Sequence, residues 1–281
     1  MDGNRLVLPD EPLVRIRPRR GVVPIDLTEL LAYHELLYFL SWRELKVRYK
    51  QTVIGASWVV MQPLLVTLVF TLFLGRLARL PSDGIPYLLF VYVAIVPWTF
   101  FSGSVTSGGQ SLVANTNLIT KVYFPRVIIP ASMIVSKLVD FAVAFVILMG
   151  MLVYYHVAPT RTLFLLPVLV AIVSVLALGV AMCASSLNVK YRDVGVALPV
   201  LLQVWMYASP IIYPASLVPD RWQTVYALNP IVGVVEGFRA SLLGRPIPVA
   251  AVIISGALSL VLLVVGSYAF RRVEKIFADI I

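Results

Sequence analysis

The stretch TLFLLPVLVAIVSVLALGVAMCASSLNV, residues 162–189, runs for 28 residues without a charged side chain. A helix needs about 20 apolar residues to cross the hydrocarbon core of a bilayer, so this stretch predicts a transmembrane helix. Further charge-free intervals lie on both sides of it, at 51–75, 84–120, 141–160, 194–219 and 246–270. The pattern indicates a multi-span membrane protein.

The composition supports this interpretation. Hydrophobic residues make up 60% of the 281 residues and charged residues only 13%, against roughly a quarter in soluble proteins. So few polar groups exclude an ordinary soluble enzyme, a disordered chain and a coiled coil. The net charge of +9 comes from short basic clusters between apolar runs, a distribution that does not predict nucleic-acid binding. Cys183 is the only cysteine, so no intrachain disulfide or cysteine-based metal site is expected.

We expect an all-α integral membrane protein with six transmembrane helices. They are predicted at about 53–74, 86–107, 128–155, 163–186, 195–213 and 248–270. An even number of helices places both termini on one side, which then carries sixteen lysines and arginines against six on the other side. The positive-inside rule predicts that both termini are cytoplasmic.

These ranges divide the chain into four regions. Residues 1–25 are expected to form an irregular cytoplasmic tail, and residues 26–50 an amphipathic interface helix. Residues 51–273 are the predicted transmembrane domain, and residues 274–281 a cytoplasmic C-terminus. No cleavable signal peptide is expected, because arginines and prolines, not an apolar core, occupy the first 24 residues.

The predicted interface helix begins with Asp26 and Glu29, which have the spacing of a capping box. An apolar and aromatic face carries Tyr38, Trp42, Leu45 and Tyr49. Another face carries Arg43, Lys46 and Lys50. A helix of this kind lies in the membrane interface, either as a generic anchor or as a segment that also contacts a cytoplasmic partner or anionic lipid head groups.

Residues 108–127 are predicted to be a cytoplasmic connection between spans. Pro125 disfavours helix at Phe124, so a short surface helix should end there. Tyr123 and Phe124, expected to be exposed beside Lys121 and Arg126, suit docking into a groove of another protein. An ordinary loop whose aromatic side chains dip into lipid fits the residues equally well.

Residues 214–247 are predicted to form an external excursion with two short helices between spans 5 and 6. Asp220 can cap the first helix. One face of the second carries Ile231, Val234, Val235, Phe238 and Leu242. This helix is too short to cross a bilayer, so it is re-entrant or interfacial. Glu236 and Arg239 can pair across it, which suggests either an outer gate or a static lid.

Two charges fall inside the third predicted span. Lys137 and Asp140 are three residues apart, so they should neutralise each other or face a polar cavity, with a structural or a transport role. Aromatic residues near the span ends belong to interfacial belts or line a path on which sugar rings stack. The candidates for the path are Trp98, Phe101, Tyr207 and Tyr213.

Nucleotide-binding and hydrolytic motifs are absent. The sequence has no P-loop, H-E-x-x-H, G-x-S-x-G or C-x-x-C pattern. Ser107-Gly108-Gly109-Gln110 resembles the signature motif of ABC ATPases, but without a P-loop it is interpreted as a coincidence. The chain is therefore not expected to be an enzyme.

Seven groups of short motifs occur in order between residues 35 and 272. They are RYKQTVIG at 48–55 with Trp58 and Gln62-Pro63, PWTFF at 97–101, NLI at 117–119 with KVYFPR at 121–126, Asp140-Phe141, NVKYRDV at 188–194, SPIIYP at 209–214, and LNP at 228–230 with EGFR at 236–239. In this order and spacing the chain resembles the polysaccharide-export permeases of type 2 ABC transporters.

The resemblance implies a homodimer bound to two copies of a separate cytoplasmic ATPase. ATP and Mg²⁺ would bind to the ATPase, and this chain would bind no cofactor. The implied activity is outward movement of a lipid-linked polysaccharide of the O antigen, capsule or teichoic acid type across the bacterial cytoplasmic (inner) membrane.

The resemblance also implies roles for individual segments. The 108–127 connection would be a coupling helix on the ATPase, with Lys121, Tyr123, Phe124, Pro125 and Arg126 in contact. The outer gate would include Glu236, Phe238 and Arg239. An inner gate or second ATPase contact would include Lys190, Tyr191, Arg192 and Asp193.

Three other classes of protein fit parts of the pattern. They are an ABC permease that exports drugs or small lipids, an ion-coupled flippase and a membrane scaffold without transport activity. The small residues Ala177, Ala181 and Ser185 on the fourth span permit close helix packing, within one chain or between two.

Overall fold

The computed structural model describes residues 32–50, 55–121, 124–158 and 160–274, and these residues form helices and turns without strands. The helices, in order, are α2 (His34–Lys50), α3 (Gly55–Phe70) with the π-helical turn η1 (Thr71–Leu77), α4 (Tyr87–Ala114), α5 (Thr116–Lys121), α6 (Ile128–Tyr154), the 3₁₀ turn η2 (Arg161–Leu165) with α7 (Leu166–Lys190), α8 (Asp193–Tyr207), the 3₁₀ turn η3 (Ala215–Leu217), α9 (Asp220–Ala227), α10 (Pro230–Leu243) and α11 (Val249–Glu274).

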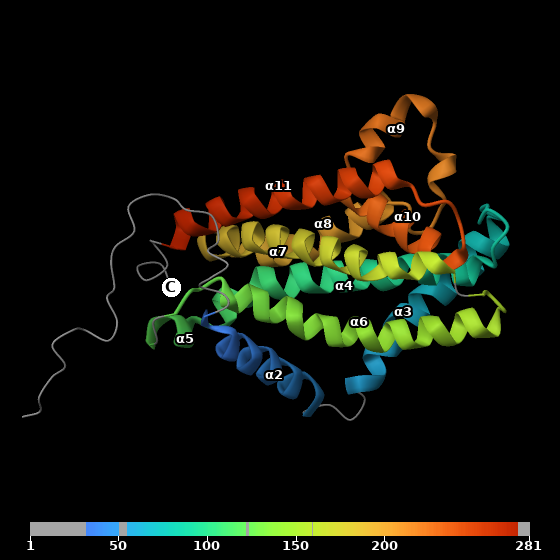
Figure 1. The fold of residues 1–281 in the computed structure, drawn as a ribbon. Helices are drawn as coiled ribbons and strands as arrows, with labels where there is room; N and C mark the ends of the chain where they lie inside the picture. Colours follow the sequence, from blue (N-terminus) through green and yellow to red (C-terminus); the bar gives the residue numbers. More distant parts are fainter. Residues whose placement is uncertain (1–31, 51–54, 122–123, 159, 275–281) are drawn as a thin grey trace, which may run out of the picture.

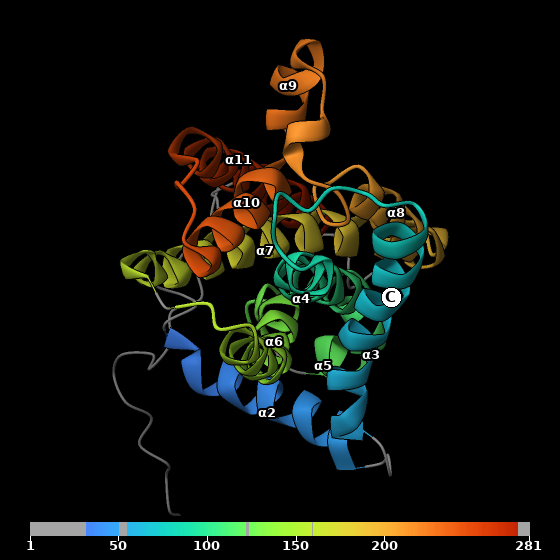
Figure 2. The ribbon, with the colours of Figure 1, turned by 90° about the vertical axis from the view of Figure 1, so that its right-hand side faces the viewer.

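The long helices α4, α6, α7 and α11 run side by side as a bundle. Figure 1 shows this bundle from the side, and Figure 2 shows it from one end. α4 lies at the centre, because it packs on α6 and α7 and its residues 89–96 are almost completely buried. α3 and η1 lie at the edge, with Trp58 and Leu68 of α3 and Phe73 of η1 all exposed. The apolar core is therefore built around one helix.

The all-helical prediction is confirmed, but the six-span count is not. Within the described residues, five helices are long and apolar enough to cross a membrane: Ser57–Leu77, Tyr87–Ala114, Ile128–Tyr154, Arg161–Lys190 and Val249–Glu274. The predicted fifth span, 195–213, is the shorter apolar helix Asp193–Tyr207. It ends before Pro210, which has no amide hydrogen and disfavours helical backbone at Ser209.

α2 lies outside the bundle and crosses α6 obliquely (Figures 1 and 2). Tyr38, Phe39 and Trp42 are exposed, as expected for a helix in a membrane interface. Arg43, expected on a separate basic face, instead donates a hydrogen bond to Asn115 at the end of α4. The proposed capping box, Asp26 and Glu29, lies outside the described residues.

A close helix contact joins α7 to α11 and depends on two glycines. A Cβ atom on Gly179 would lie 2.6 Å from the amide nitrogen of Leu263, and one on Gly266 would collide with the carbonyl oxygen of Gly179. The small residues Ala177, Ala181 and Ser185 are also buried within this single chain. Small residues let helix backbones approach closely in a membrane. The face of α7 that carries Ala177, Ala181 and Ser185 therefore packs inside the protomer.

The string Ser107-Gly108-Gly109-Gln110 has a packing role that explains its composition. It lies in α4, where a Cβ atom on Gly108 would lie 2.8 Å from the Cβ of Ala181 and one on Gly109 would lie 3.1 Å from that of Ala184. The two glycines thus let α4 approach α7. The two glycines that make this string resemble an ATPase signature motif are thus accounted for by helix packing.

The α7–α11 contact makes a first testable prediction. Gly179→Ala should destabilise the folded protein by about 1–3 kcal/mol or more, because the added methyl group meets backbone atoms that no side-chain rotation can move. Gly150→Ala in α6 is the matched control, because nothing lies within 4 Å of its Cβ position. Thermal unfolding in detergent should show a lower Tm for the first variant only, and an equal Tm for both would contradict the close contact.

Candidate functional site

One end of the bundle gathers α5, the α7–α8 turn and the last turn of α11 (Figure 1). Asn115 caps the end of α4, where its backbone N–H donates to the carbonyls of Ser111 and Leu112, and α5 begins at the next residue. Arg126 Nη1 donates to the carbonyl oxygen of Glu274 at 2.7 Å. The segment after α5 is therefore tied to the end of α11.

The predicted docking residues do not share one exposed surface. Phe124 is only 5% exposed, in a cluster with Leu112, Ile128 and Phe270, so the expectation that it is exposed is wrong. The benzyl group packs inward because the chain turns back into α6 directly after it. Lys121 is exposed, Pro125 and Arg126 are half-buried, and Tyr123 lies outside the described residues.

The turn between α7 and α8 exposes all four predicted residues, Lys190, Tyr191, Arg192 and Asp193. The Lys190 ammonium lies 5.1 Å from the centroid of the Tyr191 ring. Behind the turn, Asn188 accepts a hydrogen bond from the Gly195 amide at 3.0 Å and donates to the Gly109 carbonyl at 3.1 Å. A buried amide thus fixes an exposed turn to α4.

The other end of the bundle carries α9, which projects away from it, and α10, which packs on α11, α4 and α7 (Figures 1 and 2). Asn229 caps the start of α10, where its side chain accepts a hydrogen bond from the Ile231 amide, and Gly244 caps its end in the left-handed conformation. The predicted apolar face of this helix is confirmed: Ile231, Val234, Val235, Phe238 and Leu242 are all buried.

Arg239 is the most deeply buried charge among the described residues, at 1% exposure. Its guanidinium donates to Glu236 at 2.8 Å, which confirms the predicted pair, and to the carbonyl oxygen of Ile211 at 2.9 Å. Its Cζ atom lies 3.6 Å from the centroid of the Phe90 ring. One side chain therefore joins α10 to α4 and to the segment after α8.

The four aromatic residues predicted for a path divide into two groups. Trp98 and Phe101 are buried in the core on α4, where Phe101 meets the edge of Trp205 with ring centroids 5.2 Å apart. Tyr207 is exposed at the end of α8, and the Tyr213 hydroxyl donates to its carbonyl oxygen at 3.2 Å. Of the four, only Tyr207 is therefore exposed, and Tyr213 is half-buried.

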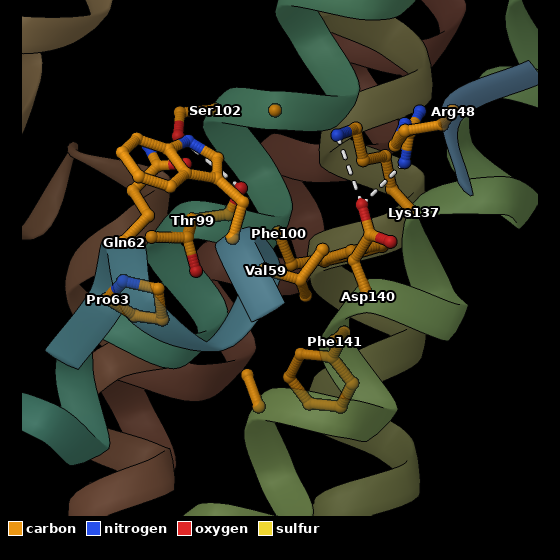
Figure 3. Close-up of a pocket in the computed structure, with 13 residues that line it drawn as sticks. Arg48, Val59, Gln62, Pro63, Thr99, Phe100, Ser102, Lys137, Asp140 and Phe141 are labelled. Carbon is orange, nitrogen blue, oxygen red and sulfur yellow. Dashed lines mark hydrogen bonds and ion pairs between the residues drawn. The ribbon is translucent and has the colours of Figure 1, made fainter. Parts of the chain in front are cut away.

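Asp140 receives hydrogen bonds from three side chains, and Figure 3 shows two of them, Arg48 and Lys137. Lys137 donates to Oδ2 at 3.1 Å, which confirms the pair predicted from sequence, and Arg48 donates to the same atom at 2.6 Å. Tyr49 donates to Oδ1 at 2.5 Å. Burial and this hydrogen bond raise the pKa of Tyr49 to about 12, so the phenol stays protonated at neutral pH.

A cavity of about 450 Å³ opens beside this cluster, between α2, α3, α4 and α6. Figure 3 shows the Arg48, Lys137 and Asp140 side chains at one end and the rings of Phe100 and Phe141 further along. Lys137 and Asp140 were expected either to neutralise each other or to face a cavity, and they do both. The cavity itself was not predicted, because its walls come from four helices.

The chemistry of these sites is that of binding and contact. No group of three or more His, Cys, Asp or Glu side chains able to hold a metal ion occurs in the part of the chain that the structure describes. The charged clusters instead join helices to one another. Such pairs hold elements in place or exchange partners when the helices move.

The two arginine pairs at the α10 end provide a matched comparison. Arg239→Ala should cost about 3–5 kcal/mol, because it leaves a buried network without its cation. Arg245 also binds a carboxylate and a carbonyl, both of Asp83, but its side chain is 28% exposed. Arg245→Ala should therefore cost under about 1 kcal/mol. Chemical unfolding in detergent compares them, and equal losses would contradict a specific role for Arg239.

Comparison with known proteins agrees with the architecture. Residues 35–243 match the family described as ABC-2 type transporter. The chain is 32% identical over 254 residues to the O-antigen export system permease protein RfbA of Myxococcus xanthus, covering 89% of this chain and 97% of the relative. It is 26% identical over 248 residues to RfbA of Klebsiella pneumoniae, covering 88% and 95% of the two chains.

A more distant relative is named for a different cargo. The polysialic acid transport protein KpsM of Escherichia coli is 23% identical over 202 residues, which cover 70% of this chain and 77% of the relative. These relatives are permeases, membrane components of transporters rather than enzymes. Since the family match covers most of the helical bundle, this chain belongs to the ABC-2 type transporter family of membrane proteins.

Proposed function

We propose that this chain is the membrane-spanning permease of an ATP-driven exporter, which moves a lipid-linked polysaccharide outward across the bacterial cytoplasmic membrane. The observation that carries the proposal is the similarity to an O-antigen export permease over 97% of that relative's length. A match of this extent includes both ends of the bundle as well as its core. The polysialic acid relative supports the same class of cargo.

The proposed orientation puts the α5 end in the cytoplasm. Lys121, Arg126, Lys190, Arg192, Arg271 and Arg272 all belong to segments at this end. The positive-inside rule favours the cytoplasm for such an end. In this orientation α2 lies along the cytoplasmic interface of the membrane, and α9 lies on the opposite, external side.

The proposed partner is a cytoplasmic ATPase, in two copies for two copies of this chain, which binds ATP and Mg²⁺. The exposed residues of α5, Asn117, Thr120 and Lys121, face away from the bundle. Phe124 and Arg126 are held by the protein itself, so they would transmit movement of α5 rather than provide its contact surface. The exposed Lys190–Asp193 turn is the second proposed contact.

The proposed homodimer uses the apolar helices that the chain itself covers least. α3 and α8 lie on the right-hand side in Figure 2, and Leu68, Val200 and Val204 among their residues are exposed. A path between two such faces would expose Tyr207 directly. Phe101 would reach it only if α8 moved, because Trp205 covers its ring.

The outer gate is proposed to be α10 with α9. Glu236, Phe238 and Arg239 hold α10 in place, with Phe238 and Arg239 both buried. Since Arg239 also binds the Ile211 carbonyl after α8, movement of α8 would strain this contact. The network would thus couple the path to the gate.

Depletion of this protein in its native host tests the function. Surface polysaccharide should fall while lipid-linked polysaccharide accumulates on the cytoplasmic face of the membrane, as measured by fractionating glycans by membrane side. Unchanged surface glycan combined with new sensitivity to drugs would contradict the proposal and favour an exporter of drugs or small lipids.

Complementation of the depleted host tests the docking end. Lys121→Glu should restore surface polymer about tenfold less well than the wild type, because one lost charge contact at an interface is worth on the order of 1–2 kcal/mol. Arg79→Glu, a reversal of another exposed cation, in the segment that follows η1 at the opposite end of the bundle, is the control and should restore it fully. Comparable membrane levels of both variants must be shown, and equal export would refute docking through α5.

A further inference from the structure

The first membrane-spanning helix ends in a π-helical turn. η1 covers the seven residues Thr71–Leu77 and continues directly from α3. The Ala78 amide donates to the Phe73 carbonyl at 2.9 Å, which is the five-residue spacing of a π-helix. A π-helical turn holds about one residue more than an α-helical turn. Such turns are rare and occur often at functional sites, so η1 points to a role beyond spanning the bilayer.

The chain on the outer side of η1 is fixed to the rest of the protein. Gly75 lies so close to α4 that a Cβ atom on it would lie 2.8 Å from the Tyr87 ring. Asp83, in the loop that follows, accepts a hydrogen bond from Arg245 at 2.9 Å through its carboxylate and another at 2.6 Å through its backbone carbonyl. The outer end of η1 is therefore an anchored point relative to which α3 can turn.

α3 itself is held by few buried side chains. Among its described residues only Pro63 and Thr67 are buried, and they share one face because they lie four residues apart. Thr67 is 1% exposed, and its hydroxyl has no hydrogen-bond partner in the part of the chain that the structure describes. A buried hydroxyl without a partner is destabilising. The face that α3 buries is therefore not optimised for stability alone.

The adjacent face of α3 would make a more apolar contact. Leu64 and Leu68 each follow one of the two buried residues by one position and have the same spacing of four. Leu64 is half-buried, and Leu68 is 51% exposed. If η1 became α-helical, the loss of its wider turn would rotate α3 by about 100°, the angle of one residue. Leu64 and Leu68 would then take the places of Pro63 and Thr67.

We propose that α3 has two registers and that conversion of η1 between π-helix and α-helix switches α3 between them. Pro63 and Thr67 face the bundle in the first register, which the structure shows. Leu64 and Leu68 face it in the second. The π-helical turn and the unpaired hydroxyl disfavour the first register, so a modest force at either end of α3 is enough to change it.

The inner end of α3 is where such a force would act. Only residues 51–54 separate α3 from α2, and Asp140 on α6 holds the end of α2 through Arg48. A shift of α2 at the membrane interface would therefore pull on α3. The use of the switch in export rests on the proposed function, in which α3 borders the path between two copies of the chain.

Deletion of Phe73 tests the switch. The deletion removes the extra residue, so η1 becomes α-helical without turning α3 and the first register is fixed. Tm in detergent should be unchanged or higher. Export by vesicles that contain the permease and its cognate ATPase should fall to the level of vesicles without the ATPase. A lower Tm would overturn the proposal, because the π-helical turn would then be required for packing, and so would normal export.

Phe73→Ala is the matched control for this deletion. It removes the same side chain, which is 55% exposed, but keeps the extra residue in η1. The variant should export as well as the wild type. Loss of export in this control would show that the side chain rather than the residue count matters, and would also overturn the switch.

Thr67→Val tests the first register from its other end. The valine has nearly the same shape and removes the unpaired hydroxyl, so Tm should rise. Export should slow about fivefold, because the first register becomes harder to leave by the worth of one typical hydrogen bond. A purely structural Thr67 would give a higher Tm with unchanged export, and that result would contradict two registers.

Fluorine labels read the rotation without any polysaccharide. In a Cys183→Ser background, Leu68→Cys and Val69→Cys each carry a trifluoroethyl group, and broadening of its NMR signal by dissolved oxygen measures exposure. Both positions are 51% exposed. When the cognate ATPase and a non-hydrolysable ATP analogue are added, the label at 68 should lose contact with oxygen. The label at 69 should keep it, because it moves to the exposed place of Leu68.

Equal changes at the two labels, or no change at either, would overturn the rotation. The deletion of Phe73 should abolish the change at 68, which links the rotation to η1. The depletion experiment reads surface glycan independently of these labels. Failure of the switch is therefore distinguishable from failure of the proposed function.

Discussion

The hydrocarbon core of a bilayer offers no water to a backbone amide or an ionised side chain, and this constraint governs the structure. In the part of the chain that the structure describes, the elements long enough to cross the bilayer are helices, which satisfy their own backbone groups. Charges within the bundle are paired: Lys137 and Arg48 bind Asp140, and Arg239 binds Glu236. Pairing is favourable because a single charge left without a partner in apolar surroundings would be costly.

Those charge pairs also join segments that lie far apart in the sequence. Asp140 ties α2 to α6, and Arg239 ties α10 to α4 and to the segment after α8. Arg126 ties the chain after α5 to the end of α11. Polar contacts therefore mark the places where the less embedded elements meet the bundle. Phe124 and Arg126 both contact the bundle just before α6 begins.

Local patterns predicted much of this arrangement. Hydrophobic runs located the long helices, and spacing of three residues identified both Lys137–Asp140 and Glu236–Arg239, because each pair lies on one turn of a helix. Arg48 and Tyr49 could not be found in this way, since they are 92 and 91 residues from Asp140 in sequence. Phe124 was expected to be exposed because it lies in a predicted cytoplasmic connection beside Lys121 and Arg126, but tertiary packing buries it. The α8 prediction was too long because Pro210 ends helical backbone early.

Transport by purified components would address ATP-driven export most directly. The permease and its cognate ATPase would be placed in vesicles with the α5 end outward, and labelled lipid-linked polysaccharide would be supplied in the outer leaflet. Addition of ATP and Mg²⁺ should move the polysaccharide into the vesicle lumen, where an added glycosidase cannot digest it, and a vesicle with the ATPase omitted should show no protection. Protection without ATP, or none with all components present, would contradict an ATP-driven exporter.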